Sequence, residues 1–173
     1  VKSIKNIKIK KIVLDPVMIA KGGSPLLTEE AMGCMRDMLV PLADILTPNL
    51  PEAAALLGQS EAENREDMLS QAKALLGLGA RNVYLKGGHF KSDESPDLML
   101  TKKAEHWLES ERIVTKNTHG TGCSLSASIA ANKAGGASEI EAANAAKRYI
   151  KNAISEAGRL QVGQGHGPVY HFL

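Results

Sequence analysis

The chain has 173 residues, 43% hydrophobic and 23% charged, a composition that excludes an intrinsically disordered, collagen-like or coiled-coil protein. Its 21 basic and 19 acidic residues give a net charge of +2, which is too balanced to favour binding to nucleic acid or to a membrane surface. We therefore expect a single globular domain over residues 1–173, with a sizeable core and no nucleic-acid or membrane partner.

The amino terminus is basic, with five lysines and no acid among its first eleven residues: Lys2, Lys5, Lys8, Lys10 and Lys11. No aromatic residues are interleaved with them, and they lead directly into an apolar run. We interpret the segment as a solvated lead-in rather than a nucleic-acid-binding arm. Because Val1 is not an initiator methionine, we expect the sequence to be part of a longer chain.

Two cysteines, Cys34 and Cys123, lie far apart in the sequence. The sequence shows no signal peptide and no apolar run approaching the ~20 residues that a membrane span needs. These features favour a cytoplasmic protein with reduced thiols.

The first half of the chain alternates short apolar strands with helices. Thr28, followed by two glutamates, predicts the start of a helix, and the apolar stripe of this helix includes Cys34, for which we expect a buried position. Two strands that end at prolines are expected at 11–15 and 44–47. Two further helices that end at glycines are expected at 51–58 and 64–78.

The second half continues the alternation and adds a hairpin. Its elements are expected in the order of a strand at 82–86, hairpin strands at 97–101 and 105–108, a glycine-rich loop at 117–123, and helices at 124–133 and 138–158. The last helix opens with an S-x-x-E capping box formed by Ser138 and Glu141. Repeated strand–loop–helix units predict an α/β fold with a mostly parallel sheet flanked by helices.

Polar residues follow each of the first three strands. In open α/β sheets, ligands bind beside the carboxyl ends of the strands, so these residues are candidates for a functional site. The glycine-rich loop at 117–123 adds backbone N–H groups at the start of a helix, where anions commonly bind. The candidates at the strand ends are Asp15, Asn49, Glu52 and Lys86.

Each of these signals has a structural alternative. Asp15 precedes a proline and is compatible with a turn, and Glu52 is compatible with a first-turn acid that the helix dipole favours. Together the candidates supply carboxylates for a hydrated Mg²⁺, a lysine and an N–H cradle, which are the groups that phosphoryl transfer from a nucleotide requires. The pattern G-x-x-x-x-G-K-[ST] is absent, which excludes a P-loop kinase.

Cys123 stands in the first turn of a helix behind the glycine-rich loop. The helix dipole and the backbone N–H groups at such a position favour a thiolate, which could accept a proton from an alcohol. The alternative is a buried cysteine in a helix of small residues, and the residues alone leave both interpretations equally open.

Residues 117–127, Asn-Thr-His-Gly-Thr-Gly-Cys-Ser-Leu-Ser-Ala, resemble the signature loop of the hydroxymethylpyrimidine/phosphomethylpyrimidine kinases of thiamine biosynthesis, within the ribokinase-like superfamily. The resemblance extends over the chain from Ile12 onward. It implies a ribokinase-like kinase domain of which this chain is the carboxy-terminal portion. Five further segments resemble that family in the family's order: 14–18, 20–23, 46–53, 85–89 and 165–169.

The resemblance also implies a role for each matching residue. Cys123 matches the catalytic base. Gly120 and Gly122 match the anion hole, and Asp15 with Glu52 matches the metal side. Lys86 is implied both in catalysis and in phosphate binding. The residues implied to bind the nucleotide are Asn49, Lys86, Thr118, His119, Gly120, Thr121 and Gly122.

The implied activity is phosphorylation of 4-amino-5-hydroxymethyl-2-methylpyrimidine, and then of its monophosphate, by a homodimer that uses ATP and Mg²⁺. The thiol of Cys123 favours these pyrimidine kinases, because most sugar kinases and pyridoxal kinases of the superfamily end this loop in G-x-G-D. Two alternatives stay open. One is a pyridoxal or pyridoxine kinase, since family members with a thiol base can accept pyridoxine-type rings, and the other is a non-catalytic nucleotide-binding fragment.

Two departures from the family's pattern bear on the site. Ser24 stands where family members commonly have an aspartate after the glycines, in a loop near the site. The family also begins with a glycine-rich segment that carries much of the pyrimidine pocket, and nothing in this sequence matches it. We therefore expect residues 1–173 alone to bind MgATP with weak or moderate affinity and to show little pyrimidine kinase activity.

Overall fold

The computed structural model describes residues 1–7, 9–19, 24–90 and 94–172. The segment 20–23, which resembles the kinase family, lies outside the described residues. Five strands form one sheet in chain order: β1 (Val13–Leu14), β2 (Ile45–Leu46), β3 (Val83–Leu85), β4 (Asp97–Leu100) and β5 (Glu105–Leu108).

The sheet combines a parallel part with an antiparallel hairpin. Strands β1, β2 and β3 run parallel, whereas β4 is antiparallel to β3 and forms the expected hairpin with β5. Because parallel strands need crossover connections, β1 and β2 are each followed by helical chain before the next strand, whereas β3 leads into the antiparallel β4. The predicted α/β fold is confirmed.

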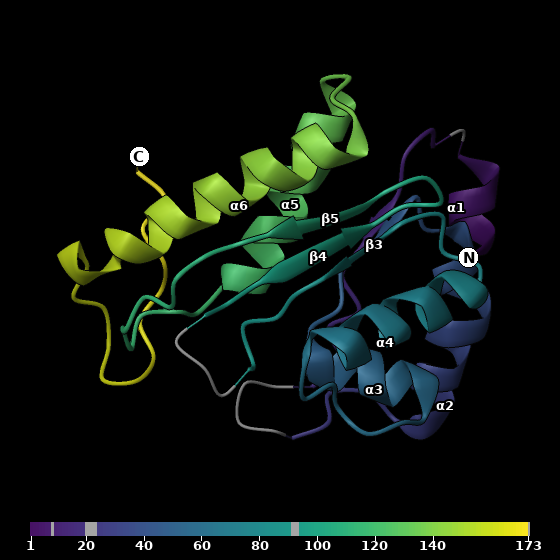
Figure 1. Cartoon of the computed structure of the whole chain (residues 1–173), viewed down its shortest axis with the longest axis horizontal. Helices are drawn as coiled ribbons and strands as arrows, with labels where there is room; N and C mark the ends of the chain where they lie inside the picture. Colours follow the sequence, from purple (N-terminus) through teal and green to yellow (C-terminus); the bar gives the residue numbers. More distant parts are fainter. Residues whose placement is uncertain (8, 20–23, 91–93, 173) are drawn as a thin grey trace.

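Helices cover both faces of the sheet. Figure 1 shows α5 and α6 on one face and α2, α3 and α4 on the other. None of the described helices is long and apolar enough to cross a membrane. The helices are α1 (Lys2–Asn6), α2 (Glu29–Cys34), α3 (Leu50–Leu57), α4 (Arg65–Gly77), α5 (Thr121–Ala134) and α6 (Glu139–Ser155).

The sheet divides the core into two layers because side chains alternate along each strand. In β3, Val83 and Leu85 pack with α3 and α4, whereas Tyr84 between them packs with α5 and α6. Both faces of β2 and β3 are buried, which explains why their sequences are uninterrupted apolar runs.

Local capping signals fix most of the helix starts. Asn49 with Glu52, and Ser138 with Glu141, form complete capping boxes at α3 and α6. The expected cap Thr28 also accepts a hydrogen bond from the backbone N–H of Ala31 at the start of α2. The predictions at Thr28 and Ser138 depended on contacts between residues three positions apart and are confirmed, whereas the capping box of Asn49 and Glu52 was not predicted.

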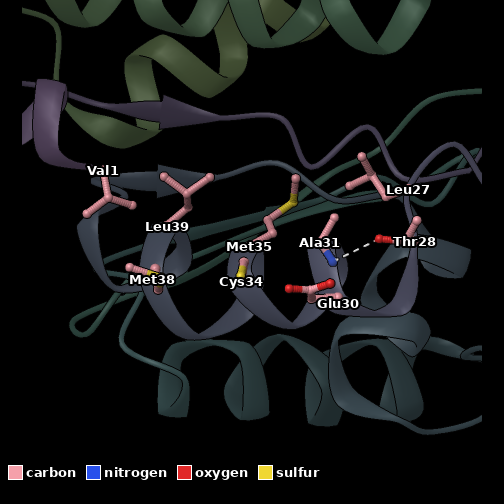
Figure 2. Close-up of a pocket in the computed structure, with 9 residues that line it drawn as sticks. All are labelled: Val1, Leu27, Thr28, Glu30, Ala31, Cys34, Met35, Met38 and Leu39. Atoms are coloured by element: carbon pink, nitrogen blue, oxygen red, sulfur yellow. Dashed lines mark hydrogen bonds between the residues drawn. The ribbon is translucent and has the colours of Figure 1, made fainter.

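The expected burial of Cys34 is wrong: the thiol is exposed. In this segment Met32 and Met35 pack against the core, and no residue of α2 is fully buried, so the core-facing side of the helix is not the side that carries Cys34. Cys34 instead lines an open pocket of about 450 Å³ along α2 and the turn that follows it, together with Met38 and Val1 (Figure 2).

One helix boundary and one short helix also differ from the expectation. Helix α5 begins at Thr121, three residues earlier than predicted, so Gly122 and Cys123 belong to its first turn. The basic amino terminus contains the short helix α1, which the sequence did not predict. A helix of five residues is too short for sequence periodicity to reveal it.

Candidate active site

The three parallel strand ends bring the predicted charged residues together. Lys86 Nζ lies 3.0 Å from Asp15 Oδ1 and 3.9 Å from Glu52 Oε2. The side chains of Lys86 and Asp15 are only 14% and 15% exposed, so their charges interact more strongly than they would at the surface. The ammonium group therefore lies near two carboxyl groups that come from different strand ends.

The register of the sheet explains this convergence. Leu14 of β1 is opposite Leu46 of β2, and Leu46 pairs with Val83 of β3. Beyond the regular ladder, Lys86 N donates to Pro48 O at 2.9 Å, which aligns the end of β3 with the turn before α3. Side chains that follow the strands by one to six residues consequently meet at one edge.

Asn49 and Glu52 form the capping box that joins this edge to α3. Asn49 Oδ1 accepts from Glu52 N at 2.8 Å, and Asn49 N donates to Glu52 Oε2 at 2.8 Å. The Glu52 side chain is only 4% exposed. Burial raises the pKa of Glu52, and the nearby Lys86 ammonium opposes that rise in part.

Glu52→Gln is expected to raise the free energy of unfolding at about pH 8 and to raise it less at about pH 4. Since the pKa of Glu52 is raised by burial, the folded state favours the protonated carboxyl, and the stability that this group contributes is lost as the pH rises through the raised pKa. Glutamine keeps an oxygen for the Asn49 N–H and carries no charge.

Urea unfolding of the parent and of Glu52→Gln at both pH values checks this prediction. The parent and the variant share every other group, so the difference between their free energies of unfolding reports the contribution of the side chain at position 52. A loss of stability in the variant at the higher pH would mean that attraction between Glu52 and Lys86 outweighs the cost of burying the carboxylate.

The glycine-rich loop reaches the same edge from the other face of the sheet. Gly120 adopts a left-handed backbone (φ 83°) and caps α5, a conformation that favours glycine. A Cβ atom placed on Gly122 would lie 3.1 Å from Lys86 Nζ, so the first turn of α5 sits directly against the ammonium group. A helix N-terminus and a lysine together make this point suited to an anion.

Cys123 follows in the first turn of α5 and is exposed, so the alternative of a buried cysteine is wrong. Its neighbour Thr121 donates its hydroxyl to Thr118 O at 2.8 Å, which ties the loop to the helix start. His119 N donates to Gly167 O at 3.0 Å. The predicted loop residues thus surround the start of α5.

Two hydroxyl groups beneath the site were not predicted from the sequence. Thr47 Oγ1 and Ser126 Oγ share a hydrogen bond of 2.8 Å, and Thr47 Oγ1 also lies 3.4 Å from Asp15 Oδ1. The pair joins the end of β2 to α5. The only sequence signal was a threonine at the end of an apolar strand, because Ser126 is 79 residues away along the chain.

A buried carboxylate holds the segment after Lys86. Asp97 accepts from Gly87 N at 2.9 Å, from Tyr84 Oη at 2.8 Å and from Lys147 Nζ at 2.7 Å. A Cβ atom on Gly87 would overlap the carbonyl oxygen of Pro96, so glycine is required for this approach. The hairpin and α6 therefore fix the position of the strand end that carries Lys86.

The donor set fits a hydrated Mg²⁺ rather than a metal held by protein groups alone. Within the ranges the structure describes, no group of three or more His, Cys, Asp or Glu side chains is arranged to hold a metal ion. Protein-bound Mg²⁺ typically uses one or two carboxylates and completes its shell with water and phosphate oxygens. Asp15 and Glu52 supply two such carboxylates at one edge.

Residues 1–170 match the family model described as phosphomethylpyrimidine kinase. The chain belongs to this family. It is 46% identical over 164 residues to the hydroxymethylpyrimidine/phosphomethylpyrimidine kinase of Salmonella typhimurium, a match that covers 95% of this chain and 62% of the relative. It is also 40% identical over 171 residues to a pyridoxine kinase of Bacillus subtilis, covering 98% of this chain and 62% of that relative.

Solved structures of the family superpose closely on the chain. The ADP complex of Bacillus subtilis pyridoxal kinase matches with a TM-score of 0.89 at 40% identity, over 98% of this chain and 63% of that one. Phosphomethylpyrimidine kinase from Clostridium difficile 630 matches with a TM-score of 0.76 at 37% identity, over 88% and 61%. The resemblance inferred from the sequence is confirmed, and the chain spans about 62% of the length of the Salmonella relative.

Proposed function

We propose that this chain carries the phosphate and metal side of an ATP-dependent kinase that phosphorylates 4-amino-5-hydroxymethyl-2-methylpyrimidine and then its monophosphate. The observation that carries the proposal is the position of Lys86 Nζ, between Asp15 and Glu52 and against Gly122 in the first turn that also contains Cys123. The sequence similarity of this chain to the Salmonella enzyme supports the proposal further.

Each group has a chemical task in this proposal. Lys86 and the backbone N–H groups of the first turn, including those of Gly120 and Gly122, stabilise negative charge on the phosphate being transferred. Cys123 Sγ, in its thiolate form, accepts the proton that the substrate hydroxyl loses as its oxygen bonds to the γ-phosphorus of ATP, while the bond from that phosphorus to the bridging oxygen breaks and ADP leaves. Asn49, Thr118, His119 and Thr121 shape the surrounding nucleotide site.

Asp15 and Glu52 are the residues that would hold Mg²⁺, which when bound neutralises part of the charge on the nucleotide phosphates. In the described structure Lys86 occupies the space between these carboxylates. The same ammonium group can turn from carboxylate to phosphate, because Lys is a flexible point charge rather than a planar fork.

A substrate competition assay tests the proposal. The two rings compete for ATP-dependent phosphorylation, and we expect preferential turnover of the pyrimidine alcohol over pyridoxine. The assay is run on residues 1–173 and on a hybrid that joins to them the part of the Salmonella relative outside the match, because the chain spans 62% of that relative.

Preferential turnover of pyridoxine by the hybrid would support the second candidate, a pyridoxine kinase, which the 40% identity to the Bacillus enzyme favours. MgATP binding without turnover of either ring in the hybrid would support a nucleotide-binding role alone. Sedimentation of the same samples tests the homodimer that we propose from the family resemblance.

A further inference from the structure

The chain after α6 turns back and runs alongside the glycine-rich loop (Figure 1). Pro168 and His119 form a parallel bridge, in which His119 N donates to Gly167 O at 3.0 Å and Val169 N donates to His119 O at 3.2 Å. Val169 is buried in the core layer between the sheet, α5 and α6. The segment Gly167–His171 is therefore anchored and also bonded to the loop.

A buried side chain closes the contact at one end. Asn117 Nδ2 donates to Ala157 O at 2.8 Å, just beyond α6. Its carboxamide packs so closely on Gly167 that a Cβ atom there would overlap Oδ1 and lie 2.8 Å from Cγ. Gly165, two residues earlier, has no atom within 4 Å of an added Cβ. Steric fit therefore requires glycine at 167 and not at 165.

The other end of the segment touches the start of α5. His171 Nε2 lies 3.4 Å from Ser124 Oγ, and His171 Nδ1 lies 2.8 Å from Tyr149 Oη. The rings of Tyr149 and His171 also stack, with centroids 6.2 Å apart. The returning segment consequently contacts both flanks of the loop, at Asn117 and at the residue after Cys123.

We propose that Gly167–His171 is a positioning strap for the loop 117–123, and that the contact between Asn117 and Gly167 is its clasp. A loop with glycines at 120 and 122 has high conformational freedom of its own, and ordering it costs entropy. Backbone N–H groups stabilise developing charge only when they are already oriented. The strap supplies that order, and its effect on phosphate binding rests on the function proposed above.

The glycine pair provides a matched test. Neither Gly165 nor Gly167 has a positive φ, so alanine at either position differs mainly in the space around it. We expect Gly167→Ala to speed hydrogen exchange of the loop amides by about tenfold or more. We also expect it to weaken MgATP binding by about tenfold, because misplacing active-site groups by about 1 Å can lower a catalytic rate by about 100-fold. Gly165→Ala is expected to match the parent in both measurements.

A double-mutant cycle assigns the effect to the clasp. In an Asn117→Ala background the added methyl group has room, so Gly167→Ala should have little further effect on loop exchange. Asn117→Ala adds no atoms, and it carries the test if Gly167→Ala does not fold. It should also speed loop exchange while leaving exchange in α4 unchanged.

The two readouts separate failure of the strap from failure of the proposed function. Faster loop exchange in Gly167→Ala, with no MgATP binding even by the parent, would support the strap and overturn nucleotide binding. Equal loop exchange in Gly165→Ala and Gly167→Ala, or additive effects in the cycle, would overturn the strap whatever the affinity for MgATP.

Discussion

Replacing Cys123 with alanine is expected to lower phosphoryl transfer by about 10²–10⁴-fold and to leave the affinity for MgATP nearly unchanged. The thiol is exposed in the first turn of α5, where it can reach a substrate hydroxyl without moving through the core. Alanine removes the proposed proton acceptor and suits a helix, so the amides of the proposed anion hole should keep their places. Single-turnover rates and MgATP titration of the parent and variant hybrids measure the two effects separately.

Cys34→Ser is the control, because Cys34 is the other exposed thiol and lines a pocket along α2 that Cys123 does not line. It should leave turnover at the parent rate. Turnover by Cys123→Ala equal to that of the parent would remove Cys123 from the chemical step. An equal fall in MgATP affinity and rate would instead indicate a binding role for this turn.

Lys86→Met is expected to lower kcat/KM by about 10²–10³-fold, because in the proposed function it removes the positive charge that stabilises the transferred phosphate. It also leaves Asp15 and Glu52 without the cation that lies 3.0 Å and 3.9 Å from them. Removing one partner of a fully buried ion pair costs about 3–5 kcal/mol, and we expect somewhat less here because the side chains keep some exposure. Steady-state kinetics and urea unfolding measure both losses.

Lys133→Met is the control that separates stability from catalysis. Lys133 is a similarly buried lysine in the last turn of α5, and its side chain is 7% exposed. Its Nζ lies 2.9 Å from Glu139 Oε1. Its replacement should lower the free energy of unfolding without a comparable fall in kcat/KM. Similar kinetic losses in both variants would mean that Lys86 acts only through stability.

A second substitution makes the Lys86 prediction sharper. Adding Asp15→Asn to Lys86→Met removes one of the unpaired carboxylates, so part of the stability should return. Activity should stay low, since the cation is still missing. Recovery of kcat/KM in the double variant would show that repulsion between carboxylates, rather than the absent ammonium group, causes the kinetic loss.

Elements with local signals could be predicted from the sequence. The strands ending near Pro16 and Pro48, and the helices capped at Asn49 and Ser138, formed within a few residues of their expected places. Their signals act between neighbours in the chain, so no tertiary information is needed. The helix that ends at Cys34 also formed, but the expected burial of Cys34 was wrong because Met32 and Met35, rather than Cys34, pack against the core.

The positions of the site residues along the chain could likewise be predicted from the sequence. By itself, the sequence placed Asp15, Glu52 and Lys86 at strand ends and Cys123 at a helix start, because residue order and turn chemistry determine those positions. It also carried the resemblance to the family to which the chain belongs.

Only the tertiary structure decided which of these groups touch. The hydrogen bond between Thr47 and Ser126 spans 79 residues, and the one between Asn117 and Ala157 spans 40. Such contacts follow from the register of the sheet and from the packing of α5 and α6, which no local pattern encodes. The charge of Lys86 was visible in the sequence, but its position between two carboxylates depends on three strands ending at one edge.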